Sequence, residues 1–126
     1  MMVPMETESD SSKPLLIYDG DCAFCRDCVE YGRRLTGDAV AYASYQQVGA
    51  RFPQVSIEQF RAAAQFVECS GKISSGAEAV FRTLAYAPRC SWLLKLYTRF
   101  RPFAAMSERV YVWVARHRNG LFRLMH

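Results

Sequence analysis

Three closely spaced cysteines are the residues of this sequence best suited to chemistry. Cys22, Cys25 and Cys28 follow a short apolar run and two acids in the stretch LLIYDGDCAFCRDCV. The first two form a CxxC pair. Thiols at this spacing can close a small disulfide ring, which an outside thiolate opens and the second thiol recloses, so the pair is suited to thiol–disulfide exchange.

The position of the pair favours the same chemistry. The apolar run predicts a buried strand at 15–18, and Cys22 falls where this strand passes into a helix whose free N–H groups favour a thiolate. Asp19 and Asp21 oppose that effect, because nearby negative charge disfavours a thiolate. Asp21 is a candidate N-cap of the helix. Asp19 is a candidate proton acceptor for Cys25, the expected resolving thiol.

The elements that follow would hold the pair in place. A helix at 23–35 and a second strand at 40–44 complete a strand–helix–strand unit with parallel strands. A second helix, a hairpin around Ser70-Gly71 and a third helix ending before Pro88 extend the order to β-α-β-α-β-β-α. This is the connectivity of the thioredoxin core, so we predict an α/β, thioredoxin-like fold.

Two further patterns concern the helices. Ser56-Ile57-Glu58-Gln59 and Ser75-Gly76-Ala77-Glu78 both have the form of capping boxes that open helices. Beyond them, we expect two additional C-terminal helices within a helical extension at about 89–126. Their apolar stripes are expected to pack inward, with binding to a membrane surface or a partner as the alternative. The stripes are Trp92, Leu93, Leu96, Tyr97 and Phe100, then Met106, Val110, Trp113, Val114 and His117.

Length and composition place limits on the class of protein. The 126 residues suit one domain, predicted at 14–126 after a flexible acidic tail at 1–13. No secretory signal and no membrane-length apolar run is recognisable, so a cytoplasmic location is expected. The five cysteines are an odd number, unlike the disulfide framework of a secreted domain.

Charge is distributed unevenly along the chain. Residues 1–71 hold ten Asp and Glu against six Lys and Arg, whereas residues 72–126 hold two against ten. The main interpretation of the basic half is a solvated helical face, and the alternatives are contact with a membrane surface, a nucleic acid or an acidic partner. Its arginines are dispersed among apolar stripes without a nucleic-acid-binding motif, so binding to nucleic acid is not expected.

Other interpretations of the cysteines and acids are weaker. A closed zinc site needs four ligands, and only Cys69, Cys90 or His117 could complete the first three cysteines, with no second CxxC present. Cys28, Cys69 and Cys90 are therefore interpreted mainly as packing residues. An Asp19-x-Asp21 pair after a strand is also typical of haloacid-dehalogenase-like phosphatases. Those enzymes need further aspartates, and this chain has none after Asp38.

The motif Asp19-Gly20-Asp21-Cys22-Ala23-Phe24-Cys25 resembles the D-x-x-C-x-x-C signature of the DCC family of thiol-disulfide oxidoreductases. The likeness extends from about Leu15 to Arg118. It includes YASYQ at 42–46, SGAEAVFRTL at 75–84 and VYVWVARHR at 110–118. The resemblance implies a thioredoxin-like fold and a redox-active CxxC pair, with Asp19, Cys22 and Cys25 as the functional residues.

The chain departs from ordinary thioredoxins in two ways. They place a cis-proline before the third strand, facing the CxxC pair, whereas Gln65 precedes Phe66 here and no proline occurs at 54–87. They also have Gly-Pro between the cysteines, whereas this chain has Ala-Phe. Both differences weaken the expectation that partner chains bind as they do in thioredoxins.

The sequence therefore predicts a thiol–disulfide oxidoreductase. Cys22 would attack, Cys25 would resolve, and Asp19 would tune the pair or carry a proton. The substrate would be a protein or a low-molecular-weight thiol or disulfide. No separate cofactor and no metal are expected, because the cysteine pair carries the electrons. The alternative is a non-catalytic thioredoxin-like module whose basic C-terminal helices bind a membrane surface or a protein partner.

Overall fold

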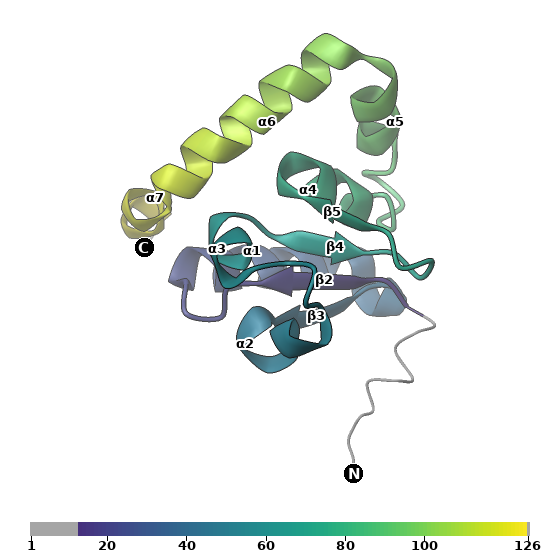
Figure 1. Cartoon of the computed structure of the whole chain (residues 1–126). Coiled ribbons are helices and arrows are strands. Elements are labelled where there is room, and N and C mark those ends of the chain that lie inside the picture. The colour runs from purple at the N-terminus through teal and green to yellow at the C-terminus, as the bar shows by residue number, and fades with distance from the viewer. Residues whose placement is uncertain (1–12, 126) are drawn as a thin grey trace.

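A four-stranded mixed sheet forms the centre of the molecule. The computed structural model describes residues 13–125, so the predicted acidic tail, apart from Lys13, lies outside the described residues. The sheet has the strand order β3-β2-β4-β5 (Figure 1). Its strands are β2 (Leu15–Tyr18), β3 (Ala41–Ser44), β4 (Gln65–Val67) and β5 (Ile73–Ser75).

The strand pairings agree with those expected from the sequence. β2 and β3 are parallel, with Leu15 opposite Ala41, and α1 (Ala23–Thr36) connects them. β4 is antiparallel to β2 and pairs with β5 in a hairpin. The expected combination of a strand–helix–strand unit, a hairpin and a closing helix is therefore present in a mixed α/β fold.

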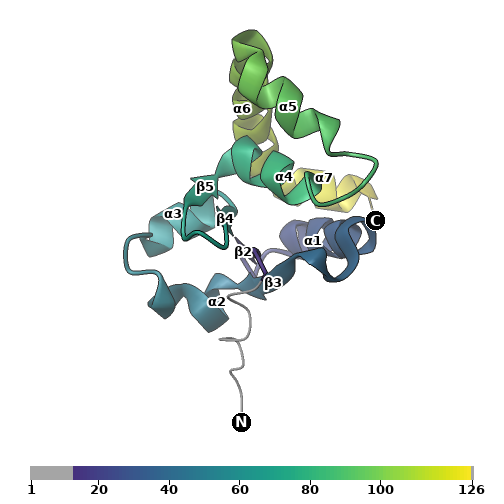
Figure 2. The same ribbon diagram turned by 90° about the vertical axis from the view of Figure 1, so that its right-hand side faces the viewer.

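Helices cover both faces of this sheet. α1 and α4 (Gly76–Leu84) lie on one face, whereas α2 (Tyr45–Val48) and α3 (Ile57–Ala62) lie on the other (Figure 2). The sequence did not predict α2, because four residues are too few to show a helical period. It begins directly after β3, where the backbone N–H of Ser44 donates to the Gln47 side chain.

Successive residues of β2 point to opposite faces of the sheet, so the strand contributes to the core on both sides. Leu15 and Ile17 point to the face of α2 and α3, where they pack with Val48 and Phe60. The opposite face packs around Phe66, which is completely buried, together with Ala79 of α4. Leu16 and Tyr18 also face this side but stay only half-buried, because α1 and α4 leave a space over them.

Within residues 13–125, three helices follow α4, not the two predicted. They are α5 (Trp92–Arg99), α6 (Arg101–Arg116) and α7 (Arg118–Met125). The chain leaves helical geometry at His117, so the predicted second segment is divided into α6 and α7. α5 and α6 pack against α4, and α7 packs against α1. No helix among the described residues has the length and apolar character needed to cross a bilayer.

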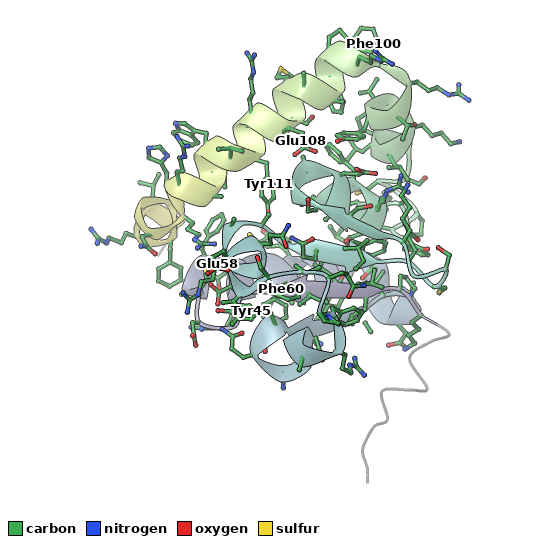
Figure 3. The ribbon with its side chains drawn as sticks, viewed as in Figure 1. Tyr45, Glu58, Phe60, Phe100, Glu108 and Tyr111 are labelled. Atoms are coloured by element: carbon green, nitrogen blue, oxygen red, sulfur yellow. The ribbon has the colours of Figure 1, made fainter. Side chains whose placement is uncertain are left out.

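Three apolar residues of the predicted inward stripe of α6 face outward, whereas Val114 lines the space over β2 as expected. Met106, Val110 and Trp113 are 55%, 54% and 54% exposed. Glu108 and Tyr111 lie on the side of α6 that faces α4 and the sheet (Figure 3). The expectation was wrong because hydrogen bonds to polar side chains, rather than the most apolar stripe, determine which face of α6 is packed.

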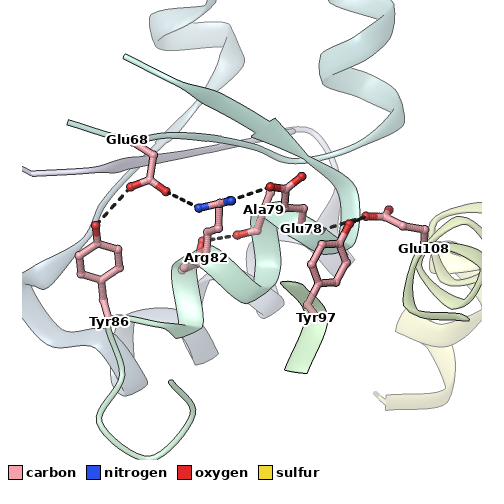
Figure 4. Close-up of polar contacts among 8 residues, drawn as sticks. Glu68, Glu78, Ala79, Arg82, Tyr86, Tyr97 and Glu108 are labelled. Atoms are coloured by element: carbon pink, nitrogen blue, oxygen red, sulfur yellow. Dashed lines mark hydrogen bonds and ion pairs between the residues drawn. The ribbon is translucent and has the colours of Figure 1, made fainter. Parts of the chain in front are cut away.

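Glu108 also replaces the predicted cap of α4. Its carboxylate accepts the N–H groups of Ala77 and Glu78, at 3.2 Å each. It also accepts the hydroxyl of Tyr97 at 2.6 Å (Figure 4). Ser75 makes no side-chain capping bond, so the predicted second capping box is wrong. Gly76 has φ +66° and leaves only 2.8 Å between a hypothetical Cβ and the Glu108 carboxylate, so this approach requires glycine.

Candidate active site

The N-terminus of α1 is built around Cys22 itself. Cys22 is the N-cap residue, and its Sγ accepts the backbone N–H of Cys25 at 3.2 Å. The prediction of Asp21 as a candidate N-cap is therefore wrong. A sulfur in this position receives a donor from the first turn of the helix, the type of contact that stabilises negative charge on it.

The two acids are held by a residue that the sequence analysis did not single out. Gln46 donates its amide to Asp19 Oδ1 at 3.0 Å and to Asp21 Oδ2 at 3.2 Å. Its amide oxygen accepts the N–H of Gly20 at 3.0 Å, and Asp19 Oδ1 also accepts the N–H of Asp21 at 3.0 Å. Gln46 therefore orients the loop and binds both carboxylates with neutral donors.

Gln46 can do this because of the parallel pairing of β2 and β3. Tyr18 lies opposite Ser44, so the residues just beyond each strand meet at the same sheet edge. Gly20 is tightly enclosed there, since a Cβ on it would lie 2.9 Å from that of Ser44. The signal in the sequence was the YASYQ segment, but without α2 the direction of the Gln46 side chain could not be inferred.

Cys25 lies behind Cys22 as a protonated thiol. Burial raises the pKa of Cys25 to about 12, and the hydrogen bond and charge of Cys22 add to this effect. The Asp19 carboxylate acts in the same direction, whereas Arg118 lowers this pKa. Both cysteines are half-buried, but their environments differ, because Cys22 Sγ accepts a helix N–H whereas desolvation is the main cause of the raised pKa of Cys25.

Arg118 is a second residue that the sequence analysis did not assign to the site. It opens α7, and its Nη1 lies 3.7 Å from the Sγ of Cys25. Its Nη2 donates to the carbonyl of Arg61 at 3.2 Å. None of the ion pairs found among residues 13–125 includes Arg118. Its 93-residue separation from Cys25 explains why spacing could not reveal it.

Tyr111 covers the backbone next to β4. Its hydroxyl accepts the N–H of Ala64 at 2.9 Å, just before the strand begins at Gln65. This is the region where a thioredoxin would have its cis-proline, and the described residues contain no cis peptide bond. A side chain of α6 therefore accepts the hydrogen bond of a backbone N–H group that lies opposite the cysteine pair.

A cavity of about 410 Å³ lies beside Cys25. It is enclosed by β2, α1, α4 and the junction of α6 and α7. Apolar and aromatic side chains form most of its wall, including Leu16, Phe24, Tyr42, Val80, Leu84 and Val114. Cys25, Cys28, Asp19 and Arg118 also contribute to the wall.

The remaining cysteines take different positions. Cys28 lies one turn beyond Cys25 and contributes to the cavity wall, but it is exposed, so its interpretation as a packing residue is wrong. Partial desolvation of its thiol raises its pKa. Cys69 is exposed in the hairpin after β4, at the sheet end away from Cys22. Within the described part of the chain, no cluster of three or more His, Cys, Asp or Glu side chains could hold a metal ion.

Comparison with known families agrees with the geometry of the site. The sequence model of the DCC1-like thiol-disulfide oxidoreductase family matches residues 16–124, nearly the whole chain. The chain belongs to this family. The resemblance found in the D-x-x-C-x-x-C motif is thus confirmed. No curated protein and no solved structure matches the chain. The DCC1-like family description indicates the reaction class, and the CxxC pair is the part of the chain suited to it.

Proposed function

We propose that this protein catalyses thiol–disulfide exchange through Cys22 and Cys25, in a thioredoxin-like arrangement. The observation that carries the proposal is the asymmetry of the pair. Cys22 Sγ accepts the helix N–H of Cys25 at 3.2 Å, whereas burial and Cys22 raise the pKa of Cys25 to about 12. An accessible attacking thiolate and a protonated thiol in reserve are the two components that exchange needs.

In the first step, Cys22 attacks the substrate. Its thiolate forms a bond to one sulfur of the substrate disulfide, and the other substrate sulfur leaves as a thiolate. Cys22 is then neutral in a mixed disulfide. The charge and hydrogen bond of Cys22 both raise the pKa of Cys25. Their loss lowers that pKa at the point when Cys25 must ionise.

In the second step, Cys25 resolves the mixed disulfide. It loses its proton, attacks the Sγ of Cys22, and releases the second substrate thiolate. The reaction leaves a Cys22–Cys25 disulfide and two substrate thiols, a transfer of two electrons. Arg118, 3.7 Å from Cys25 Sγ, stabilises the transient thiolate, and Asp19 is the proposed proton acceptor. The reverse sequence oxidises substrate thiols.

A redox titration tests this function. The wild-type protein and single serine variants at Cys22 and Cys25 are equilibrated in glutathione buffers, and the disulfide is mapped by mass spectrometry. We expect one reversible bond between Cys22 and Cys25, with a potential within roughly −120 to −270 mV, the range of known oxidoreductases. A pair that never oxidises, or a Cys22→Ser variant that oxidises like wild type, would rule out the proposal.

The proton role of Asp19 needs a separate test. Asp19→Asn should slow the release of thiol from a preformed mixed disulfide, most strongly at low pH, where the loss of the Cys25 proton limits the rate. Asp21→Asn is the matched control, because Asp21 is bound by the same Gln46 amide but, unlike Asp19, is not among the main causes of the raised pKa of Cys25. Equal rates for both variants across pH would remove Asp19 from the mechanism.

A second function, binding to an anionic membrane surface, is supported by the outward face of α6. Met106, Val110 and Trp113 are about half exposed there, and the exposed Arg109 and Arg116 flank them. Apolar and aromatic side chains beside basic ones on one helix are typical of helices that lie in a membrane interface.

Sedimentation with vesicles tests this second function. Vesicles containing phosphatidylserine should bind the protein, whereas phosphatidylcholine vesicles should not. Trp113→Ala should weaken binding several-fold, and Ile57→Ala, at an exposed apolar residue of α3, should leave it unchanged. Equal binding to both vesicle types, or equal effects of the two variants, would contradict a specific role for α6.

A further inference from the structure

The cavity beside Cys25 has the properties of a ligand site. Its volume of about 410 Å³ falls in the range of roughly 300–1,000 Å³ that binding pockets for small molecules occupy. The wall is overwhelmingly apolar, and it includes the aromatic rings of Phe24, Tyr31 and Tyr42. Such a wall favours an apolar molecule, because every polar group placed against it would lose hydrogen bonds to water.

One charged group in this wall needs a partner. Arg118 donates to the Arg61 carbonyl and to Cys25 Sγ, both of which are neutral in the reduced resting protein. Asp19, the acid among the wall residues, is bound instead by neutral donors from Asp21 and Gln46. A guanidinium at the edge of an apolar cavity favours an anionic group, which it can bind through charge-assisted hydrogen bonds.

The backbone around the cavity is closed to an extended peptide. A peptide that adds to a strand needs free backbone donors and acceptors along its path. Here the Ala64 N–H is bound by Tyr111, and the Arg61 carbonyl by Arg118. Both contacts come from the C-terminal helices. Docking by backbone pairing is thereby blocked at this point, whereas the apolar space behind it remains.

We propose that this cavity binds a free low-molecular-weight molecule with an apolar body and one anionic head group. The body lies between α1 and α4, and the head group pairs with Arg118 beside Cys25. The proposal involves no covalent step and does not depend on the redox function. It assigns Arg118 a second role, which the exchange reaction does not require.

Two related fluorescent probes test the role of charge. 1-Anilinonaphthalene-8-sulfonate carries a sulfonate, and N-phenyl-1-naphthylamine has the same rings without it. Reduced full-length protein should bind both. Arg118→Gln should weaken binding of the sulfonate about tenfold and change binding of the neutral probe less than about twofold, because a charge-assisted contact is lost only with the first. Equal changes for both probes, or no change, would overturn the proposed pairing.

A matched pair of alanine-to-phenylalanine substitutions tests where the ligand binds. Ala115→Phe places a ring in the cavity wall, whereas Ala105→Phe places the same ring on an exposed part of the same helix. We expect at least a tenfold loss of probe binding for Ala115→Phe and none for Ala105→Phe. The control matters because the exposed apolar face of α6 could also bind such dyes. A folded Ala115→Phe variant with wild-type binding would place the ligand elsewhere.

The wild-type protein provides a test that does not depend on any variant folding. Cys28 and Cys69 are both exposed, but only Cys28 contributes to the cavity wall, whereas Cys69 lies in a distant hairpin. Saturating sulfonate probe should slow the alkylation of Cys28 by N-ethylmaleimide at least fivefold and leave Cys69 unchanged. Protection of neither thiol, or of both equally, would overturn the site. The Cys22–Cys25 potential, measured on the same samples, reports separately on the exchange function.

Discussion

The N-termini of α1 and α4 lie on the same face of the sheet, but their backbone N–H groups are bound by different kinds of acceptor. At α4, the carboxylate of Glu108 accepts two backbone N–H groups and the Tyr97 hydroxyl. At α1, the acceptor is the sulfur of Cys22, which belongs to the helix itself. A carboxylate is a strong acceptor with a permanent charge, whereas sulfur is a weak acceptor whose charge depends on its chemical state.

This difference separates stability from reactivity. The α4 terminus is used to attach α5 and α6, because its cap comes from one of these helices and bonds to the other. At the α1 terminus, the N–H of Cys25 is bound to a group that gains and loses charge in the proposed reaction. The acids near it do not cap the helix, since Gln46 holds both of them in the preceding loop.

The largest expected effect comes from removing the sulfur at α1. Cys22→Ser should lower the exchange rate at least about 100-fold, because the attacking thiolate is lost. It should also lower the pKa of Cys25 from about 12 toward the ordinary 9.0, since two of the causes of the raised value come from Cys22. Burial keeps the new value above 9.0.

The pH dependence of Cys25 alkylation measures that shift. The midpoint in Cys22→Ser should lie below the wild-type midpoint, and Cys69→Ser, at an exposed cysteine outside the site, should match wild type. An unchanged Cys25 midpoint in Cys22→Ser would show that the two cysteines do not interact, and the proposed control of Cys25 by Cys22 would be wrong.

The next largest effect is on stability at α4. Glu108→Ala should destabilise the protein by about 2–3 kcal/mol, because two helix N–H groups and a hydroxyl lose a charged partner. Urea unfolding measures this change. Glu58→Ala, at an exposed glutamate of α3, should cost less than about 0.5 kcal/mol. A similar small cost for Glu108→Ala would mean that the cap contributes little.

A smaller effect is expected for the loop before α1. Gln46→Ala should cost about 1 kcal/mol, because its hydrogen bonds lie near solvent. It should also slow exchange by roughly threefold to tenfold, since the loop that positions Cys22 loses its support. The exposed Gln54→Ala is the control. Exchange at the wild-type rate in Gln46→Ala would show that the loop keeps its conformation without the hydrogen bonds of Gln46.

The smallest expected effect concerns two serines that look alike in sequence. Ser56 caps α3 by accepting the N–H of Gln59 at 3.1 Å, so Ser56→Ala should cost about 1 kcal/mol. Ser75→Ala should cost less than about 0.5 kcal/mol, because Glu108 has taken the capping role. Thermal unfolding of both variants gives the comparison. Equal losses would contradict the difference between the two helix termini.

These serines show what the sequence could predict. The capping box at Ser56 is a local pattern, and the structure confirms it. The same pattern at Ser75 failed because an acceptor from a distant helix competed for the donors. The strands, α1 and the parallel pairing of β2 with β3 were predictable from apolar runs and connection length, which are also local signals.

The residues of the candidate site show the same distinction between local patterns and contacts from distant elements. Cys22, Cys25 and Asp19 could be proposed from the sequence because they belong to one short motif, and their catalytic roles stay predictions. Gln46, Tyr111 and Arg118 were not, because each reaches the site through tertiary contacts from another element. The outward face of α6 was mispredicted for the same reason. Its apolar stripe indicated a packed face, whereas contacts of Glu108 and Tyr111 determine the orientation.

The spacing of Glu108 and Tyr111 has a consequence for local unfolding. The two residues lie one turn apart on α6, and one binds the α4 terminus while the other binds Ala64 beside the cysteine pair. Detachment of this turn would expose both places together. The amide protons of Ala77, Glu78 and Ala64 should therefore exchange with solvent as one cooperative unit, although α4 and the start of β4 are separate elements.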